Sequence, residues 1–357
     1  MTIAHINRIA TAVPDHDVHG AFVGYARSLL EGTRAKVFDR LVLRSQIGHR
    51  YSVLAASDDP DTGSVDAGGV YGRGHFPSTA GRMALYEQHA APLAEKAILG
   101  LGLTAKERSA VTHLVVTSCT GMYAPGLDLE LVARCGLSPS VERTMVGFMG
   151  CYAAINGLKL AHHIVRSQPS AKVLMVNLEL CSLHLQETSE IDLMMSFLIF
   201  GDGCAASLVS ADPVGIAVDR FHAALLPDTQ RLITWNVGDV GFDMGLSPKV
   251  PAAIELGLPM AAGAILDGAP ANAIDRWAVH PGGRAVLDAV QHGLELAVDA
   301  LAGSRAVLQG FGNMSSATVM FVLEGVLRDA NPGERGCAMS FGPGLTAETM
   351  LFHRARA

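Results

Sequence analysis

Hydrophobic positions recur at a helical spacing after two glycines in the middle of the chain. In "MVGFMGCYAAINGLKLAHHIV", residues 145–165, small and aliphatic residues repeat every three or four positions. This spacing predicts an amphipathic helix over 151–167 with a buried apolar face. Because Gly147 and Gly150 loosen the chain just before it, Cys151 is expected near the helix N-terminus.

Short apolar runs of strand character alternate with helical patterns of this kind. Two such runs are "HLVVTSC", residues 113–119, and "KVLMVNLEL", residues 172–180. The alternation predicts an α/β protein built in layers. The Asp- and Gly-rich stretch 56–74 predicts a loop, and "ADPVG" is expected to join two halves, residues 1–211 and 212–357.

A weak internal echo supports the division into two halves. "GFMGCYAAINGLKLA" and "GFGNMSSATVMFVLE" both pass from glycines through one polar or reactive residue into a helical pattern. Cys151 and Asn313 occupy matching places in the two segments. The chain is therefore predicted to contain one duplicated unit, whereas an array of short repeats is not visible.

The predicted position of Cys151 has a chemical consequence. Unpaired backbone N–H groups and the positive end of the helix dipole favour a thiolate there, which lowers the pKa of a cysteine and makes it nucleophilic. A second interpretation is that Cys151 is only a small core residue, since free cysteines are often buried. This segment alone leaves both interpretations open.

Two polar residues in the second half occupy positions typical of active sites. In "RWAVHPGG" a histidine ends a predicted strand and Pro-Gly-Gly leaves regular structure, so His280 is expected on a loop at a layer edge. Asn313 stands between a glycine and a predicted helix, where it is either a functional residue or an ordinary N-cap.

Composition excludes several classes of protein. The chain has 357 residues, of which 49% are hydrophobic and 17% charged, so it is expected to be globular rather than disordered. A net charge of −7 provides no broad basic surface for nucleic acid. No apolar run is long enough for a membrane span or a secretory signal, which predicts a cytoplasmic protein without stable membrane insertion.

The cysteines and histidines do not form a metal-binding pattern. Six cysteines are scattered without CxxC pairs, which is typical of reduced thiols. His162 and His163 lack companion ligands at metal spacing and are interpreted as surface or packed residues.

Several ordered motifs resemble the type III polyketide synthases, the chalcone and stilbene synthase family. They are the cysteine segment quoted above, "FGDG", "HPGG", "GNMSSA" and "FGPGLTAE". The resemblance implies a thiolase-like fold of two duplicated halves in αβαβα layers, with Cys151 as nucleophile and His280 and Asn313 as its partners. It also implies a homodimer, because "SCTGMYAPGLD", residues 118–128, is similar to the family's interface segment and puts Tyr123 and Ala124 near the partner's cavity.

The resemblance further implies a substrate pocket, with departures from plant members. Met244 stands where plant members carry a second gatekeeper phenylalanine, and Ser340 replaces the first glycine of "GFGPG". The segment 179–186 looks bacterial, which favours a fatty acyl starter and an alkylpyrone or alkylresorcinol product. The implied pocket residues are Phe200, Met244, His184, Trp235, Ser315, Phe341, Gly342 and Pro343.

These residues support a coherent chemistry without metal or redox cofactors. A Cys151 thiolate, stabilised by a His280 imidazolium, would accept an acyl group from CoA. Malonyl-CoA would then lose carbon dioxide, and its enolate would be stabilised by His280 and Asn313 before it attacks the acyl-cysteine. The basic segment 39–51 is expected to bind the CoA phosphates through Arg44 and Arg50, unless it is only the solvated face of an amphipathic helix.

Three other functions remain possible at this point. A ketoacyl synthase III-like enzyme would also use Cys, His and Asn but would perform a single condensation. A catalytically silent thiolase-fold subunit would be expected to lack the thiol, which this chain retains at Cys151. A cysteine hydrolase would need a base that activates water, and the motifs supply none.

Overall fold

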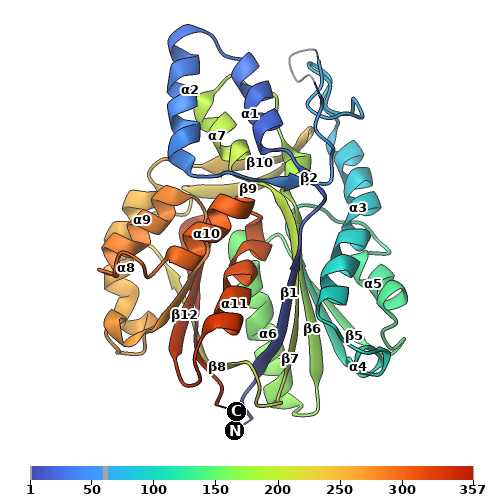
Figure 1. The fold of residues 1–357 in the computed structure, drawn as a ribbon, viewed down its shortest axis with the longest axis vertical. Helices are drawn as coiled ribbons and strands as arrows, with labels where there is room; N and C mark the ends of the chain where they lie inside the picture. Colours follow the sequence, from blue (N-terminus) through green and yellow to red (C-terminus); the bar gives the residue numbers. More distant parts are fainter. Residues whose placement is uncertain (1, 59–62, 357) are drawn as a thin grey trace.

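The chain folds around one large twisted β-sheet. The computed structural model describes residues 2–58 and 63–356, which form a nine-stranded sheet of order β11-β12-β13-β8-β1-β7-β6-β4-β5 (Figure 1). Its strands are β1 His5–Ala12, β4 His113–Ser118, β5 Glu142–Gly147, β6 Lys172–Leu180, β7 Asp202–Ser210, β8 Ile216–Leu225, β11 Arg276–Val279, β12 Arg335–Gly342 and β13 Thr346–Arg354.

The sheet consists of two parts with the same sequence of strand directions. In β5-β4-β6-β7-β1, the first two pairings are parallel and the next two antiparallel. In β11-β12-β13-β8, a parallel pairing is likewise followed by two antiparallel ones. The parts meet where β1 pairs with β8 at only two positions, His5 with Ala217 and Ile6 with Ile216. This repetition agrees with the predicted duplication.

Helices cover both parts and also fill the space between them (Figure 1). α6 and α11 lie between the two parts, and their apolar residues form a shared hydrophobic cluster with strands of both. α3 packs on the outer face of the first part, and α8 packs on β8 of the second. The layers therefore alternate as αβαβα, as predicted. The helices named here are α3 Thr79–Gly100, α6 Ala153–Ser167, α8 Val250–Ile265 and α11 Thr318–Asp329.

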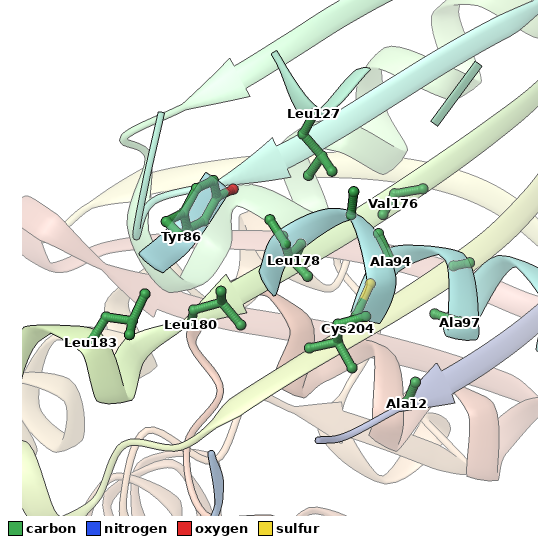
Figure 2. Packing of buried hydrophobic residues seen from close by; sticks show 14 of the residues in the cluster. Ala12, Tyr86, Ala94, Ala97, Leu127, Val176, Leu178, Leu180, Leu183 and Cys204 are labelled. Carbon is green, nitrogen blue, oxygen red and sulfur yellow. The ribbon is translucent and has the colours of Figure 1, made fainter. Parts of the chain in front are cut away.

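Small residues allow the layers to approach closely. On α3, Ala94 and Ala97 are fully buried against the strands that carry Leu178 and Cys204 (Figure 2). Burying each large aliphatic side chain in such a cluster contributes about 1.5–3 kcal/mol relative to exposure. Because the layers are tightly packed, they hold the strand ends rigidly, and the candidate site lies at those ends.

Several of the remaining elements gather at one end of the molecule, drawn at the top of Figure 1. There α1, α2 and α7 stand above the hairpin of β9 and β10. Helices α5, α9, α10 and the short α4 complete the outer layers. The bounds of these elements are β2 His16–Asp17, β3 Tyr51–Ser52, β9 Ile233–Gly238, β10 Gly241–Leu246, α1 His19–Ser28, α2 Gly32–Ser45, α4 Ala105–Ser109, α5 Leu127–Cys135, α7 Ile191–Leu198, α9 Arg284–Gly293 and α10 Ala302–Phe311.

Several sequence-based expectations can be compared with this fold. The described residues of the predicted loop 56–74 form turns and isolated bridges, while residues 59–62 lie outside the described part. β7 ends at Ser210 and β8 begins at Ile216, but the division into 1–211 and 212–357 stays a prediction. His162 is buried against the ring of Phe221 and His163 is exposed, as interpreted from the sequence.

The described residues contain neither a candidate membrane span nor a candidate metal site. Within 2–58 and 63–356, no helix has the length and apolarity that a membrane span requires. Across the same ranges, no group of three or more His, Cys, Asp or Glu side chains could hold a metal ion.

Candidate active site

Cys151 lies at the entry to a central helix, as predicted. β5 ends at Gly147, and a 3-10 turn, Gly150–Tyr152, leads directly into α6. Gly150 has φ +76° and faces Pro343 so closely that a Cβ there would overlap the proline ring. Only glycine fits this position, since the left-handed region is unfavourable for other residues. The turn thus presses Cys151 against the Gly342–Pro343 segment.

His280 comes directly after β11, at the edge predicted from the sequence. Its backbone N–H donates to the Met339 carbonyl at 2.8 Å, which extends the pairing of β11 with β12 by one residue. The side chain is 1% exposed. Neither ring nitrogen has a hydrogen-bond partner among the described residues. Both nitrogens therefore remain available to a bound substrate.

Asn313 is held by backbone contacts on both sides. Its N–H donates to the Ile199 carbonyl at 2.8 Å, and its carbonyl accepts from the Gly201 N–H at 2.9 Å. The side-chain oxygen accepts from the Ser315 N–H at 2.8 Å, while the amide nitrogen donates to the Gly282 carbonyl at 3.4 Å and also interacts with the Cys151 thiol. The side-chain oxygen thus caps the first N–H of the 3-10 turn Ser315–Ala317, while the amide N–H groups lie on the side of the Cys151 thiol. The two interpretations of Asn313 are therefore compatible, and its catalytic role stays a prediction.

Cys151, His280 and Asn313 come together around one small cavity. Its volume is about 40 Å³, and a second cavity of about 30 Å³ also touches Cys151. The first, which we call the reaction chamber, is lined by Cys151, Phe200, Ile233, Met244, Leu246, Val250, His280, Gly282, Val286, Asn313, Phe341 and Gly342. The second, the acyl chamber, is lined by Cys119, Thr120, Gly150, Cys151, Cys181, His184, Phe197, Phe200, Ile233, Trp235, Met244, Ser315 and Pro343.

The eight pocket residues expected from the sequence all line one chamber or the other. Phe200 and Met244 line both and thus stand between them. Phe341 and Gly342 border the reaction chamber, whereas His184, Trp235, Ser315 and Pro343 border the acyl chamber. Their roles toward substrate remain predictions.

Two lining residues of the acyl chamber, His184 and Trp235, pack with Phe242 in an aromatic cluster. The imidazole of His184 stacks on Phe242 with ring centroids 4.2 Å apart, and Trp235 meets both rings edge-on. His184 accepts from the Phe242 N–H at Nδ1, so its Nε2 carries the proton that is donated to the Thr120 carbonyl. Burial also lowers the pKa of His184 to about 4, so this ring is neutral near pH 7.

The electrostatics differ from the sequence-based expectation of a thiolate–imidazolium pair. Burial raises the pKa of the Cys151 thiol to about 12, and burial lowers the pKa of His280 to about 3. Hydrogen bonds from Ser315 and Asn313 act in the opposite direction on Cys151 but do not outweigh the loss of solvation. The expected lowering of the cysteine pKa is therefore wrong for the closed site, where both groups are neutral.

Sequence reasoning missed one buried acid beside the site. Glu179 is fully buried at the end of β6, where it accepts hydrogen bonds from the Cys119 N–H, the Thr120 hydroxyl and the Ser316 hydroxyl. Burial raises the pKa of Glu179 to about 7, and its charge contributes to raising that of Cys151. The sequence does contain a signal for this residue, because a glutamate inside the apolar run "KVLMVNLEL" must be buried with hydrogen-bond partners.

The two predicted CoA anchors have different surroundings. Arg44 is exposed near the end of α2, so its role as a phosphate anchor stays a prediction. Arg50 is 1% exposed and donates to the Phe200 carbonyl at 2.8 Å. A guanidinium buried in this way is not available to a CoA phosphate at the surface, so the expectation for Arg50 is wrong.

Comparison with known proteins identifies the family to which this arrangement belongs. The family model for the N-terminal domain of chalcone and stilbene synthases matches residues 4–213, and that for the C-terminal domain matches residues 218–355. The chain belongs to the chalcone and stilbene synthase family. It is accordingly a type III polyketide synthase, a condensing acyltransferase that uses acyl-CoA and malonyl-CoA.

Individual relatives agree with this membership and with a bacterial type. The chain is 34% identical over 98% of its length to the "Alpha-pyrone synthesis polyketide synthase-like Pks18" of Mycobacterium tuberculosis, of which it covers 91%. It is 36% identical over 72% of its length to the 1,3,6,8-tetrahydroxynaphthalene synthase of Streptomyces peucetius, and 72% of that protein is covered. The crystal structure of PKS-I from the brown alga Ectocarpus siliculosus superposes with a TM-score of 0.87 at 32% identity, covering 99% of each chain.

Family membership decides among the functions that the sequence left open. The polyketide synthase interpretation is confirmed over the ketoacyl synthase III-like enzyme and the cysteine hydrolase. The thiol that a silent subunit would lack is present and lines both chambers.

Proposed function

We propose that this polyketide synthase loads its starter on Cys151 and uses His280 and Asn313 to extend the chain with malonyl units before the product cyclises. The observation that carries the proposal is the meeting of these three side chains around the reaction chamber. They come from the entry of α6, the end of β11 and the start of the segment before α11. A thiol, an imidazole and an amide are the groups that acyl transfer and enolate stabilisation require.

Loading begins from a neutral pair. As the Cys151 sulfur attacks the thioester carbonyl of the acyl-CoA, His280 accepts the thiol proton. The bond from the carbonyl carbon to the CoA sulfur then breaks, and His280 returns the proton to the departing CoA thiolate. Because burial raises the pKa of Cys151 and lowers that of His280, neither group holds a charge between turnovers. The transfer therefore requires that the bound acyl-CoA bring the two pKa values closer together.

Extension uses the same chamber with different hydrogen bonds. When malonyl-CoA loses carbon dioxide, the electron pair of the broken bond passes to an enolate whose oxygen is the thioester oxygen. The oriented Asn313 amide and a His280 ring N–H would donate to that oxygen. The enolate carbon then attacks the acyl carbonyl on Cys151, the bond from that carbon to the Cys151 sulfur breaks, and the chain moves to CoA. The released thiolate takes a proton from solvent, which restores the thiol.

The acyl chamber supports an apolar chain as starter. Its main polar side chains are already hydrogen-bonded to the protein. Thr120 donates to Glu179 and accepts from the Leu180 N–H, His184 is bonded at both nitrogens, and the Trp235 N–H donates to the Cys119 carbonyl. A hydroxylated aromatic starter would find little to bind its hydroxyl. We therefore propose a fatty acyl starter and an alkylpyrone or alkylresorcinol product, in line with the α-pyrone named for the mycobacterial relative.

The size of the chamber limits how a chain enters. A volume of about 30 Å³ has room for only a few water molecules, since one water needs about 10–15 Å³ on this scale. A longer chain must therefore displace a lining side chain, and Met244 is the most adaptable one, since methionine is unbranched and flexible. Met244 thus places a flexible side chain between the two chambers, where plant members carry a rigid phenylalanine.

Competition among starters tests the proposed substrate class. Straight-chain acyl-CoA esters of increasing length should show kcat/KM rising by up to about fourfold per added methylene until the chamber is full, the gain expected for burying each CH₂. As a matched variant, Met244→Phe should shift the optimum to shorter chains, because the ring cannot fold aside. A preference of the wild-type enzyme for hydroxycinnamoyl-CoA over every aliphatic ester would overturn the starter class while leaving the family unchanged.

We also propose a homodimer that covers the β5 edge of the sheet. β5 is the outermost strand and is largely exposed, including Met145 at 42%. Met122 and Leu129 nearby are exposed at 58% and 45%, in and just beyond the segment that resembles the family's interface. An exposed edge strand flanked by apolar side chains is a typical pairing surface.

We retain the cytoplasm as the proposed location. All six cysteines are free thiols in the structure. Unpaired cysteines of this number are typical of a reducing compartment.

A further inference from the structure

Arg50 carries a buried positive charge that no step of the proposed mechanism uses. It lines neither chamber and is 1% exposed. Burial lowers the pKa of its guanidinium to about 10, so the group is still charged near pH 7. Moving this charge out of water costs solvation free energy. We therefore expect the hydrogen bonds of the guanidinium to offset that cost by holding other parts of the structure.

The head of Arg50 holds the segment that carries Phe200. Its Nη1 donates to the Phe200 carbonyl at 2.8 Å and makes a longer bond of 3.5 Å to the Phe197 carbonyl. Its Nε donates to Nδ1 of His19 at 2.9 Å. Burial lowers the pKa of His19 to about 4, so that nitrogen is an acceptor near neutral pH. The guanidinium therefore joins α1 to the last turn of α7.

The Phe200 segment is in turn paired with Asn313. The two residues form an isolated parallel bridge, through the Asn313 N–H to the Ile199 carbonyl and the Gly201 N–H to the Asn313 carbonyl. These two hydrogen bonds fix the position of the Asn313 backbone relative to that of Phe200. Phe200, which lines both chambers, and the amide that would stabilise the enolate are therefore positioned by the same backbone pairing.

The aliphatic stem of Arg50 packs against the same two segments. At Gly312, which has φ +68°, a Cβ would lie 2.8 Å from Cγ of Arg50 and 2.9 Å from the Ile199 carbonyl oxygen. At Gly201, a Cβ would lie 3.4 Å from Cβ of Arg50. Arg50 therefore touches the glycine just before Asn313 and the glycine just after Phe200.

We infer that Arg50 is a positioning residue for the extension step, which holds in place the backbone pairing between Phe200 and Asn313. The inference rests on the proposed roles of Cys151 and Asn313. Cys151 belongs to the turn between β5 and α6, which Arg50 does not contact through any hydrogen bond of the described residues. Loss of the guanidinium should therefore impair extension far more than loading.

Two rates measured on the same variants test this division. Loading of an acyl-CoA is followed by intact-protein mass spectrometry, and extension by carbon dioxide release from malonyl-CoA. Arg50→Met keeps the stem but removes the charge and the donors. We expect its loading rate to stay within about twofold of wild type, while carbon dioxide release falls on the order of 100-fold, as for Asn313→Ala.

Two milder variants keep the test decisive if Arg50→Met does not fold. Arg50→Lys retains one donor without the planar fork, so its ratio of extension to loading should lie between wild type and Asn313→Ala. His19→Leu removes the partner of Nε alone and should lower the same ratio by a smaller factor. The product length distribution should also change in these variants, because Phe200 is displaced with Asn313.

The possible outcomes separate this inference from the proposed function. If Cys151 has been assigned wrongly, Cys151→Ala still loads, and if Asn313 has been assigned wrongly, Asn313→Ala extends normally. If those controls behave as expected but every folded Arg50 and His19 variant has the wild-type ratio of extension to loading, the positioning role is wrong. A parallel loss of both rates would likewise contradict it, since that is the effect of a merely structural residue.

Discussion

Burial and hydrogen bonding act in opposite directions on the Cys151 thiol. The turn into α6 and the hydrogen bonds from Ser315 and Asn313 favour the thiolate, but burial raises its pKa to about 12. Burial lowers the pKa of His280 to about 3. A neutral thiol beside a neutral imidazole can still react at neutral pH, because the proton moves within the site rather than to solvent.

His280→Ala tests this internal transfer through the pH dependence of loading. In the wild-type enzyme the rate should be nearly flat from about pH 6 to about pH 9, a range that lies between the two pKa values. Without the imidazole, Cys151 must lose its proton to solvent. Because its pKa is raised, the thiolate fraction grows about tenfold per pH unit throughout this range, and the loading rate should follow it upward.

The measurement is rapid quenching followed by intact-protein mass spectrometry across pH. Cys151→Ala provides the background at each pH. A flat profile for His280→Ala at the wild-type rate would mean that His280 takes no part in loading.

At the level of single residues, the sequence revealed the groups with recognisable neighbours. Cys151, His280 and Asn313 each follow or precede glycines within a motif, and the structure places all three on one chamber. Glu179 and Arg50 were not assigned correctly, because their roles depend on burial and on partners more than 50 positions away, as with Glu179 and Cys119 or Arg50 and Phe200. The glutamate within the apolar run 172–180 signals a buried acid, but the partners in such long-range hydrogen bonds leave no local pattern in a single sequence.

Among the elements, the turn before α6 decides how closely the two halves approach at the site. Gly150 belongs to the first half and Pro343 to the loop between β12 and β13. A Cβ at Gly342 would lie 2.6 Å from the ring of Tyr152 on the same turn. The close contact of these two glycine-containing segments closes the chambers around Cys151.

Gly150→Ala and Gly136→Ala form a matched pair that tests this contact. Both glycines have positive φ, +76° and +64°, but a Cβ at Gly136 meets nothing within 4 Å. Gly136→Ala should lower the free energy of unfolding by about 1–2 kcal/mol through backbone strain alone and leave turnover unchanged. Gly150→Ala should cost a further 1–3 kcal/mol or so for the clash with Pro343, and it should abolish turnover.

Urea denaturation and product formation provide the two readouts. Equal stability losses in the two variants, together with normal turnover by Gly150→Ala, would show that the approach of Pro343 is not needed.

Elements with strong periodicity were predicted closely, whereas those defined by tertiary contacts were not. The run 172–180 is β6 over the same residues, and the helix predicted over 151–167 is α6, Ala153–Ser167, after one 3-10 turn. The hairpin of β9 and β10 was not predicted. Its position depends on bonds such as that of the Trp235 N–H to the Cys119 carbonyl, which local periodicity does not encode.

For the whole molecule, the exposed β5 edge leads to a prediction about assembly. Sedimentation at micromolar concentration should show a dimer, because burying a standard interface of about 1,600 Å² would remove the exposed apolar side chains from water. Met145→Glu on β5 should shift the molecule to monomer by placing a charge in that interface. Met260 on α8 is 75% exposed, and α8 packs on β8, which lies five strands away from β5 in the sheet. Met260→Glu should therefore remain dimeric.

A wild-type protein that sediments as a monomer would contradict the proposed homodimer. The same conclusion would follow if Met260→Glu dissociated the dimer and Met145→Glu did not, since the interface would then lie on the opposite part of the sheet.

The most direct test of the central claim is to map the acyl group after a single loading reaction. Cys119 and Cys181 line the acyl chamber together with Cys151, so the alternatives lie in the same cavity. After incubation with a fatty acyl-CoA and proteolysis, mass spectrometry should find the acyl group on the Cys151 peptide of the wild-type enzyme and none on Cys151→Ala. Cys119→Ala and Cys181→Ala should still load at Cys151. An acyl group on Cys119 or Cys181, or a loaded Cys151→Ala, would contradict the account.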